Sequence, residues 1–331
     1  MHAAVVRSFD TPPRFDTIDP PQPQGEHEIL VDVLAAGLHP RVRSGANGSH
    51  YTSDGVLPLV PGIDAVGRSA QGELLYFVAP DTALGTMAEQ AVVDRRRAIT
   101  LPPGTDPVAV AAAMNPAMSS WVALRRRVTL RPGGSVLVLG ATGNAGQLAV
   151  QIAKHLGATQ VVAAGRDPER LGLLGRLGAD ETISLLGDPE QVADHLGRSA
   201  GDVDVVIDYL WGPAAEAAMP ALLKARSERS KPLAWIQIGS MAGADLTLPS
   251  YLLRSANLQI MGSGQGSLST AGILAELPSL AAEIASGTLS VNPLAIPLAQ
   301  VEQAWNTPTA PSRRIVLTPG NRPAHAADRR Q

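Results

Sequence analysis

The hydrophobic and polar positions in the first third of the chain predict short strands separated by turns. The expected strands are 5–7, 28–34 and 87–93, where apolar residues alternate with polar ones or form brief runs. Proline and glycine crowd between these stretches, for example at Pro12-Pro13 and Pro61-Gly62, and indicate turns. This part of the chain is therefore expected to be rich in β-structure.

The pattern changes after Pro102-Pro103-Gly104. Asp106 is a suitable N-cap with Pro107 behind it, so a helix is expected through Met114, and a second one over 118–127. Short apolar runs then alternate with amphipathic stretches. The expected strands are 135–139, 160–164, 181–185, 203–207, 234–238 and 258–261, and the expected helices are 145–156, 168–177, 213–224 and 269–286. Such alternation predicts an α/β fold with a doubly wound parallel sheet that carries helices on both faces.

The pattern returns to β after about residue 287, with a short helix at 298–305 and a last strand at 315–317. The segment 319–331 has no apolar periodicity, and we expect it to be a mobile tail. We therefore expect one domain from 1–112 and 288–318 and a second domain from 113–287.

Composition narrows the class of protein. Apolar residues make up 45% and charged residues 17%, which indicates a chain that buries a large core. The formal charge of -3 gives no electrostatic case for nucleic acid or an anionic membrane as a partner. The 331 residues include no cysteine, and apolar runs such as 108–114 are far shorter than a membrane span. A cytoplasmic protein is expected.

The strongest motif is a glycine-rich turn between an expected strand and an expected helix. In it, Gly140 lets the chain turn sharply, Gly143 leaves room for a pyrophosphate, and Gly146 lets helix and strand pack closely. The N-terminus of the helix offers N–H groups and a partial positive charge to phosphates. The turn predicts dinucleotide binding by Gly140, Thr142, Gly143, Asn144, Ala145 and Gly146.

The end of the next strand indicates which dinucleotide. A site for NAD usually has an acidic residue about 20 residues past the glycines, but here Gly165 occupies that position. Arg166 follows at once and Arg170 lies one helical turn further on, and guanidinium groups suit a 2′-phosphate. Asp167 is a competing acidic candidate, although it also suits an N-cap before Pro168. We therefore predict NADP(H) rather than NAD(H).

The order and spacing of several short motifs resemble the medium-chain dehydrogenase/reductase superfamily, and most of all its zinc-free quinone oxidoreductase branch. The matching stretches are 36–40 (AGLHP), 61–67 (PGIDAVG), 85–89 (GTMAE), 140–146 (GATGNAG), 203–208 (VDVVID) and 238–240 (IGS). The resemblance implies a GroES-like catalytic domain beside a Rossmann domain, with substrate in the cleft between them. It also implies hydride transfer from the nicotinamide to a small electrophilic acceptor.

The zinc enzymes of that superfamily carry a Cys and a Gly-His-Glu motif where this chain has His39 and Gly62-Ile63-Asp64. Two scattered candidate ligands do not make a zinc site, so no metal is expected. Without a strong Lewis acid, reduction of a quinone or of an alkene conjugated to a carbonyl is favoured over alcohol oxidation.

Four residues are candidates for the chemistry. Related enoyl reductases carry a Tyr in a loop similar to 45–54, so Tyr51 is the first candidate for proton donation, and its neighbour His50 is a rival. His39 stands where the family usually has an Asn that faces the nicotinamide, and it is a candidate donor to the acceptor. Asp64 is expected to hold backbone N–H groups near the cleft rather than to act as a base.

Further cofactor contacts are expected where parallel strands end, at Gly239, Ser240, Ser263 and Gly264. We predict an NADPH-dependent quinone oxidoreductase that forms a homodimer, with the edge of strand 258–261 as the candidate contact. Two alternatives stay open: a reductase of enoyl-thioester or alkenal double bonds, and a catalytically silent NADPH-binding sensor.

Overall fold

The computed structural model describes residues 1–50, 53–79, 82–308 and 313–320. The chain divides into two units. Unit 1 consists of 1–112, 281–286 and 292–331, and unit 2 of 113–280 and 287–291. The chain passes between the units four times, and two of these passages lie within the helices α2 (Pro107–Val122) and α9 (Leu277–Ala285).

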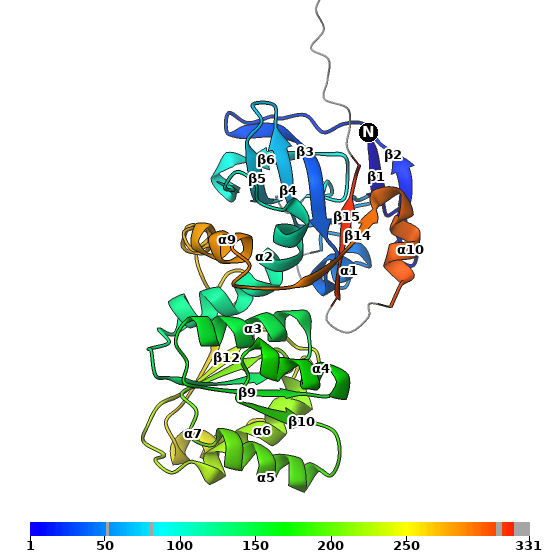
Figure 1. The fold of residues 1–331 in the computed structure, drawn as a ribbon. Helices are drawn as coiled ribbons and strands as arrows, with labels where there is room; N and C mark the ends of the chain where they lie inside the picture. The colour runs from blue at the N-terminus through cyan, green and yellow to red at the C-terminus, as the bar shows by residue number, and fades with distance from the viewer. Residues whose placement is uncertain (51–52, 80–81, 309–312, 321–331) are drawn as a thin grey trace, which may run out of the picture. The chain divides into compact units, whose positions relative to one another are not determined.

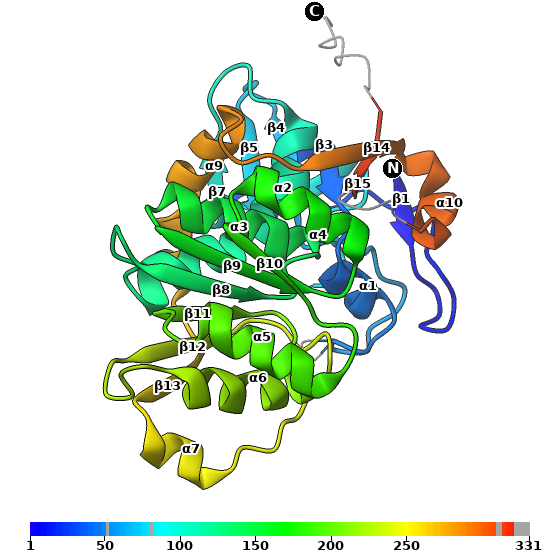
Figure 2. The same ribbon diagram turned by 60° about the horizontal axis from the view of Figure 1, so that its bottom comes forward.

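Unit 2 has a parallel sheet of six strands in the order β10-β9-β8-β11-β12-β13. The strands are β8 (Ser135–Leu139), β9 (Gln160–Gly165), β10 (Glu181–Ser184), β11 (Val205–Asp208), β12 (Leu233–Gln237) and β13 (Leu258–Gly262). The helices are α3 (Asn144–His155), α4 (Pro168–Leu174), α5 (Pro189–Ala200), α6 (Gly212–Ala225), α7 (Ser250–Ser255) and α8 (Thr270–Leu274). Helices α3 and α4 cover one face of the sheet, and α5 and α6 cover the other (Figures 1 and 2).

The four inner strands of unit 2, β8, β9, β11 and β12, are mostly apolar because both faces of the sheet are covered. The side chains of Leu137, Val206 and Trp235 are fully buried in this core. Since all six strands are parallel, the segments that follow them emerge at one edge, which we call the carboxyl edge. The doubly wound architecture predicted for this part of the chain is confirmed.

Unit 1 has a sheet in the order β14-β15-β3-β4-β5-β7, with β6 also paired to β3, and a separate pair formed by β1 and β2. The strands are β1 (His2–Val5), β2 (Arg14–Thr17), β3 (Glu28–Gly37), β4 (Asp64–Ser69), β5 (Leu74–Val78), β6 (Gln90–Asp94), β7 (Ala98–Thr100), β14 (Asn292–Pro297) and β15 (Arg313–Thr318). Two short helices complete it, α1 (Pro40–Ala46) and α10 (Val301–Asn306). The predicted β-rich character of this region is confirmed.

Two helical predictions are wrong in detail. The two helices expected over 107–127 form one continuous α2 that contains Pro116 and ends in a π-helical turn, Ala123–Arg127. The single helix expected over 269–286 is instead two, α8 and α9, because Pro278 suits the first turn of a new helix and not the interior of an old one.

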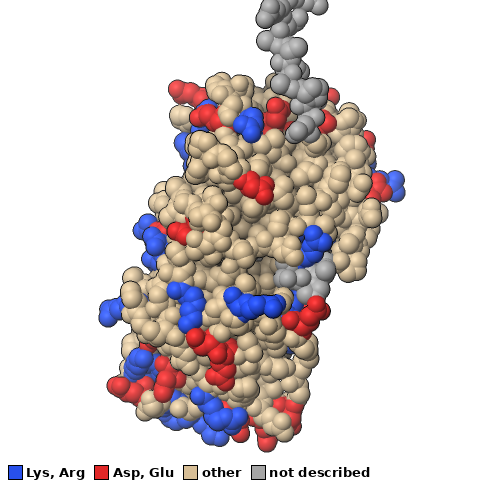
Figure 3. Space-filling model, in the orientation of Figure 1, with Lys and Arg blue, Asp and Glu red and all other residues tan. Residues whose placement is uncertain are grey.

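One helix of the described residues, Pro107–Arg127, is long and apolar enough to cross a membrane by length and composition. Of its most apolar window, 67% is buried inside the protein, which is typical of a core helix. On the face drawn in Figure 3, Lys and Arg side chains are interspersed with Asp and Glu.

Candidate functional site

The glycine-rich turn joins β8 to α3 at the carboxyl edge of unit 2. Gly140 has a φ of 87°, in the left-handed region that favours glycine. A Cβ at Gly146 would lie 2.3 Å from the carbonyl oxygen of Gly140, so this position admits only glycine if α3 is to pack against the turn. At Gly143 the nearest atom to such a Cβ is 3.5 Å away, which leaves the approach to the N-terminus of α3 open.

The N-terminus of α3 suits a phosphate group. Its N-cap is Gly143, which has no side chain to cap the helix. The first N–H groups of an α-helix have no partner within the helix and carry a partial positive charge. The open approach over Gly143 and this uncapped helix end together fit the pyrophosphate of a dinucleotide.

The end of β9 lies beside the same turn. A Cβ at Gly165 would lie 2.4 Å from the Cγ2 of Thr142, so the small residue here allows β9 and the turn to approach closely. Arg170 Nη1 donates to the carbonyl oxygen of Thr142 over 3.3 Å, which fixes the guanidinium against the turn. Arg166 is exposed next to it.

Asp167 is engaged by its own helix. Its Oδ1 accepts a hydrogen bond from the backbone N–H of Arg170 over 3.1 Å, as an N-cap does. Its Oδ2 lies 3.2 Å from the Nε of Arg170. Oδ1 of Asp167 therefore caps α4, and Oδ2 lies in an ion pair with Arg170.

The ends of β11, β12 and β13 reach the same carboxyl edge. Gly239 packs against the backbone of Tyr209, since a Cβ there would lie 2.8 Å from the Tyr209 carbonyl oxygen. Ser240 and Gly264 are exposed and Ser263 is half-buried. The structure thus brings the residues predicted for cofactor binding to one edge of one sheet, and their role in binding stays a prediction.

Asp208, at the end of β11, holds this edge together. Its carboxylate accepts hydrogen bonds from the backbone N–H groups of Leu210 and Trp211 and from the indole Nε1 of Trp235, over 2.8–2.9 Å. Burial raises the pKa of Asp208. Trp211 has a φ of 54° and is the one non-glycine residue with a left-handed backbone among those described. The two N–H bonds to Asp208 stabilise this strained turn.

The functional candidates of unit 1 centre on a buried network. His39 precedes α1, and its Nε2 lies 3.0 Å from Oδ1 of Asp64 at the start of β4. Tyr76, on β5, donates its hydroxyl hydrogen to Oδ2 of the same carboxylate over 3.0 Å. The exposed fractions of these three residues are only 3%, 1% and 0%.

The network fixes the form of the His39 imidazole. Burial lowers the pKa of His39, against the opposing effect of Asp64, so the ring is neutral at pH 7. With Asp64 accepting from Nε2, the one N–H of the neutral ring is used and Nδ1 is left as an acceptor. Burial also raises the pKa of Tyr76 well above its usual value, so its hydroxyl stays protonated.

Tyr76 and Arg314 were not anticipated from the sequence. Tyr76 interrupts the apolar run of β5, and a buried Tyr hydroxyl requires a partner, which was the one available signal. Arg314 on β15 is 6% exposed and donates from Nη1 to the carbonyl oxygen of Leu38 over 3.3 Å. Burial lowers the pKa of Arg314 to about 10, so it is a cation at neutral pH.

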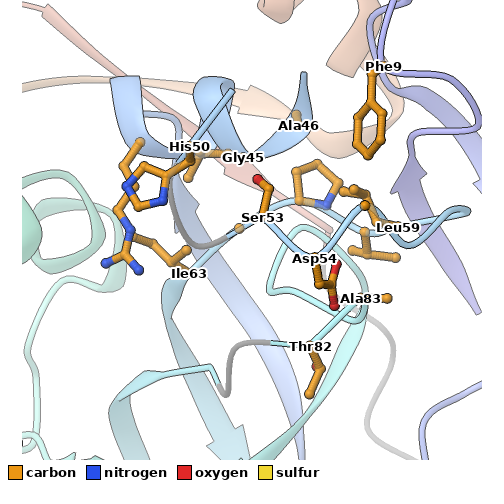
Figure 4. Close-up of a pocket in the computed structure, with 16 residues that line it drawn as sticks. Phe9, Gly45, Ala46, His50, Ser53, Asp54, Leu59, Ile63, Thr82 and Ala83 are labelled. Carbon is orange, nitrogen blue, oxygen red and sulfur yellow. The ribbon is translucent and has the colours of Figure 1, made fainter. Parts of the chain in front are cut away.

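A hollow of about 100 Å³ opens beside α1 in unit 1. His50 and Ile63 lie on one side of it and Phe9 and Leu59 on the other, with Ser53 between them (Figure 4). His50 donates its backbone N–H to the carbonyl oxygen of Ser44 over 3.0 Å, which ties the loop to α1. Tyr51 lies outside the described residues, as does 321–331 of the expected tail.

The residues present do not fit a zinc ion. Within 1–50, 53–79, 82–308 and 313–320, no three His, Asp or Glu side chains gather closely enough to hold a metal. His39 and Asp64 are bonded to each other, and the chain has no cysteine.

Comparison with known proteins agrees with this architecture. Residues 145–277 match the family model described as "Zinc-binding dehydrogenase". A probable NADPH-dependent quinone reductase of Emericella nidulans is 32% identical, over 96% of this chain and 100% of the relative. An NADPH-dependent alkenal/one oxidoreductase of Arabidopsis thaliana is 32% identical over 48% of this chain and 45% of the relative.

A solved structure resembles the whole chain. The quinone oxidoreductase of Thermus thermophilus, also solved in complex with NADPH, has a TM-score of 0.78 and 26% identity over 96% of this chain and 100% of that protein. The fold and these relatives define an oxidoreductase class. The chain belongs to the medium-chain dehydrogenase/reductase superfamily, in its quinone reductase-like branch. The family, fold class and oxidoreductase class predicted from the sequence are confirmed.

Proposed function

We propose that the protein reduces a quinone or another activated small-molecule acceptor with NADPH, with unit 2 as the dinucleotide-binding domain and unit 1 as the catalytic domain. The observation that carries the proposal is the open, uncapped N-terminus of α3 beside two arginines and an acidic residue that is already engaged. The named activities of the Emericella and Thermus proteins support the same interpretation.

The choice of NADPH rests on the end of β9. Asp167 is the acidic residue nearest to Gly165 in the sequence, and its carboxylate caps α4 and forms an ion pair with Arg170, which disfavours its use by a ribose 2′-hydroxyl. Arg166 is exposed and Arg170 is anchored on the phosphate-binding turn. Both guanidiniums are proposed to bind the 2′-phosphate, and the turn 140–146 the pyrophosphate.

The bound NADPH supplies the hydride, and the protein supplies orientation and proton control. His39 is proposed to line the acceptor site as a neutral ring, held by Asp64, whose carboxylate is in turn held by Tyr76. Because its only N–H is bonded to Asp64, neutral His39 supplies neither the proton nor a hydrogen bond to the acceptor's carbonyl, and it is proposed to shape the wall of the site. Tyr51 stays the proposed proton donor, with His50 as the rival.

A second acceptor class has some support. The Arabidopsis relative is named for alkenals and enones, and a conjugated alkene needs a hydride and a proton just as a quinone does. Tyr51, the proposed proton donor, would orient the carbonyl of either acceptor.

Assembly and location are proposed from fewer observations. β13 is an edge strand, and the adjoining α7 exposes Tyr251 and Leu253 by 55% and 49%. A homodimer that pairs the β13 edges would cover both features. The absence of cysteine suits the cytoplasm, which is the proposed compartment.

The test is oxidation of NADPH and NADH against 1,4-benzoquinone, 9,10-phenanthrenequinone, an alkenal and an enoyl thioester. NADPH-specific turnover of a quinone supports the main proposal, and turnover of the alkenal or the thioester alone supports the second class. Tight NADPH binding without turnover across the panel would contradict both and favour the sensor alternative. For the proton donor, Tyr51→Phe should lower turnover at least tenfold, and full activity in this variant would exclude that role.

A further inference from the structure

The end of α2 forms a second hollow, which the proposed reaction does not use. Its volume is about 350 Å³, at the lower end of the range for small-molecule sites. All of its walls belong to unit 2. They comprise Leu124, Arg125, Arg126, Thr129, Leu130, Leu156 and Glu276. Leu156 follows the last residue of α3, so the hollow and the phosphate-binding turn lie at opposite ends of a helix about 18 Å long.

The hollow is built on the π-helical turn Ala123–Arg127. The backbone N–H of Val128 donates to the carbonyl oxygen of Ala123 over 3.0 Å, the wider spacing of a π-helix. Single π-helical turns are rare in proteins, and those that occur are often found at functional sites. On a regular helix, adjacent residues point in directions about 100° apart, yet here Arg125 and Arg126 reach the same carboxylate.

That carboxylate belongs to Glu276, whose side chain is 5% exposed. Arg125 Nε donates to its Oε2 over 2.6 Å, and Arg126 Nε donates to its Oε1. Burial opposes ionisation of Glu276, but these two guanidiniums lower its pKa, so the carboxyl is charged. Arg125 and Arg126 are exposed at the surface, and both also contact this one buried acid.

The two arginines retain binding capacity. Their side chains are 41% and 46% exposed, and among the described residues no hydrogen bond is made by the Nη groups of either one. Two cations share one anion, which leaves one positive charge over. Arg125 is also held in place, with its guanidinium carbon 5.1 Å from the ring centre of Trp121, which stacks on His155. An ordered guanidinium loses less conformational entropy when it binds a ligand.

The floor of the hollow is apolar. Leu124 and Leu130 are buried and Leu156 is half-buried. A pair of guanidiniums above an apolar floor matches a ligand that has an anionic head and a short apolar body. We propose that this hollow binds an amphiphilic anion, a carboxylate or a phosphate monoester that carries an alkyl chain.

The first experiment uses calorimetric titration of the full chain at low ionic strength, without NADPH, so that its outcome is independent of the proposed reaction. The probes are octanoate and octyl phosphate, with octanol and octylammonium as controls of equal chain length. The proposal predicts 1:1 binding of at least one anion, at least tenfold tighter than either control. Equal binding of octanol, or no saturable binding of either anion, would overturn it.

Variants then locate the site. Arg125→Gln and Arg126→Gln should each weaken binding of the preferred anion at least tenfold. Arg131→Gln makes the same change of charge at an exposed arginine outside the hollow and should alter the affinity less than twofold. Equal losses in the three variants would show non-specific charge attraction and contradict the site.

Glu276→Gln is expected to strengthen binding of the anion. A gain of affinity cannot be explained by unfolding of the variant. Removal of the competing carboxylate frees both guanidiniums, so the anion should bind at least threefold more tightly. A folded Glu276→Gln variant, checked by its melting temperature, that binds the anion more weakly would overturn the proposal.

Discussion

The glycine-rich turn of unit 2, residues 140–146, and the His39 network of unit 1 are built in opposite ways. The turn consists of backbone groups, and its geometry requires positions without a side chain. Gly146 is an example, because a Cβ there would clash with the backbone of Gly140. The network consists of side chains from three separate elements that converge on one buried carboxylate. A backbone site is specified by local spacing, whereas a side-chain network is specified by tertiary packing. Substitutions in the turn and in the network should therefore have different effects on stability, on NADPH binding and on reduction of the acceptor.

The largest effect is expected at the turn. Gly146→Ala places a Cβ 2.3 Å from a backbone oxygen that cannot move away. Overpacking of this kind should lower the free energy of unfolding by about 3 kcal/mol and abolish measurable NADPH binding. Chemical denaturation and fluorescence titration with NADPH measure the two effects.

Gly172→Ala is the matched control. A Cβ there meets no atom within 4 Å, and the residue lies within α4. Alanine should raise the free energy of unfolding by about 0.5–1 kcal/mol and leave NADPH binding unchanged. Similar behaviour of the two variants would contradict the account of the turn.

The next effect concerns the side chains that border the turn. Arg166→Gln and Arg170→Gln should each weaken NADPH binding about 10- to 100-fold, since each removes charge-assisted bonds to a phosphate. NADH binding should change little, because NADH lacks the 2′-phosphate. Arg176→Gln, at an exposed arginine further along the chain, is the control. Parallel loss of NADH affinity would mean that the arginines only support the fold.

A smaller effect is expected in the network. Asp64→Asn leaves His39 and Tyr76 with one amide in place of a carboxylate and should lower the free energy of unfolding by about 2 kcal/mol. Tyr76→Phe removes one hydrogen bond and should lower it by about 1 kcal/mol. NADPH binding to both variants should match that of the unchanged protein, and reduction of the acceptor should slow. Loss of NADPH binding in either variant would show that the network and the turn are not independent of each other.

The smallest effect is a pH dependence. The pKa of His39 is lower in the folded protein than in the unfolded chain, where it is about 6.5, so below that pH the unfolded chain binds more protons. Stability should thus be fully present above about pH 6.5 and should fall as the pH drops through this value. In His39→Asn this part of the slope should vanish, and in His27→Asn, at an exposed histidine, it should remain. Denaturation between about pH 5 and 8 measures it.

The same contrast explains what the sequence allowed to be predicted. The strand–turn–helix unit and the parallel sheet were accessible because glycine spacing and apolar runs are local features. The continuity of α2 through Pro116 was not, because burial of the helix overrides a local break signal. The division of 269–286 into two helices was not predictable either. Glu276, between them, accepts hydrogen bonds from two arginines that lie about 150 residues earlier in the chain.

In the candidate site, too, local features could be predicted from the sequence and long-range contacts could not. His39 and Asp64 were singled out individually, but their bond depends on how β3 and β4 pair, which spacing along the chain does not encode. Tyr76 was missed because it lies within an otherwise apolar strand, and Arg314 because it is nearly 280 residues from the carbonyl group of Leu38 that it binds.

Arg43 covers the indole ring of Trp305, with its guanidinium carbon 5.2 Å from the ring centre, and its Nη1 donates to the carbonyl oxygen of the same residue. Of the four tryptophans in the chain, Trp305 alone belongs to unit 1, while Trp121, Trp211 and Trp235 belong to unit 2. One tryptophan of unit 1 and three of unit 2 therefore contribute to the tryptophan fluorescence of the protein. A Trp305→Phe protein would emit from unit 2 alone, and subtraction of its melting curve from that of the unchanged chain would give each unit an optical signal of its own.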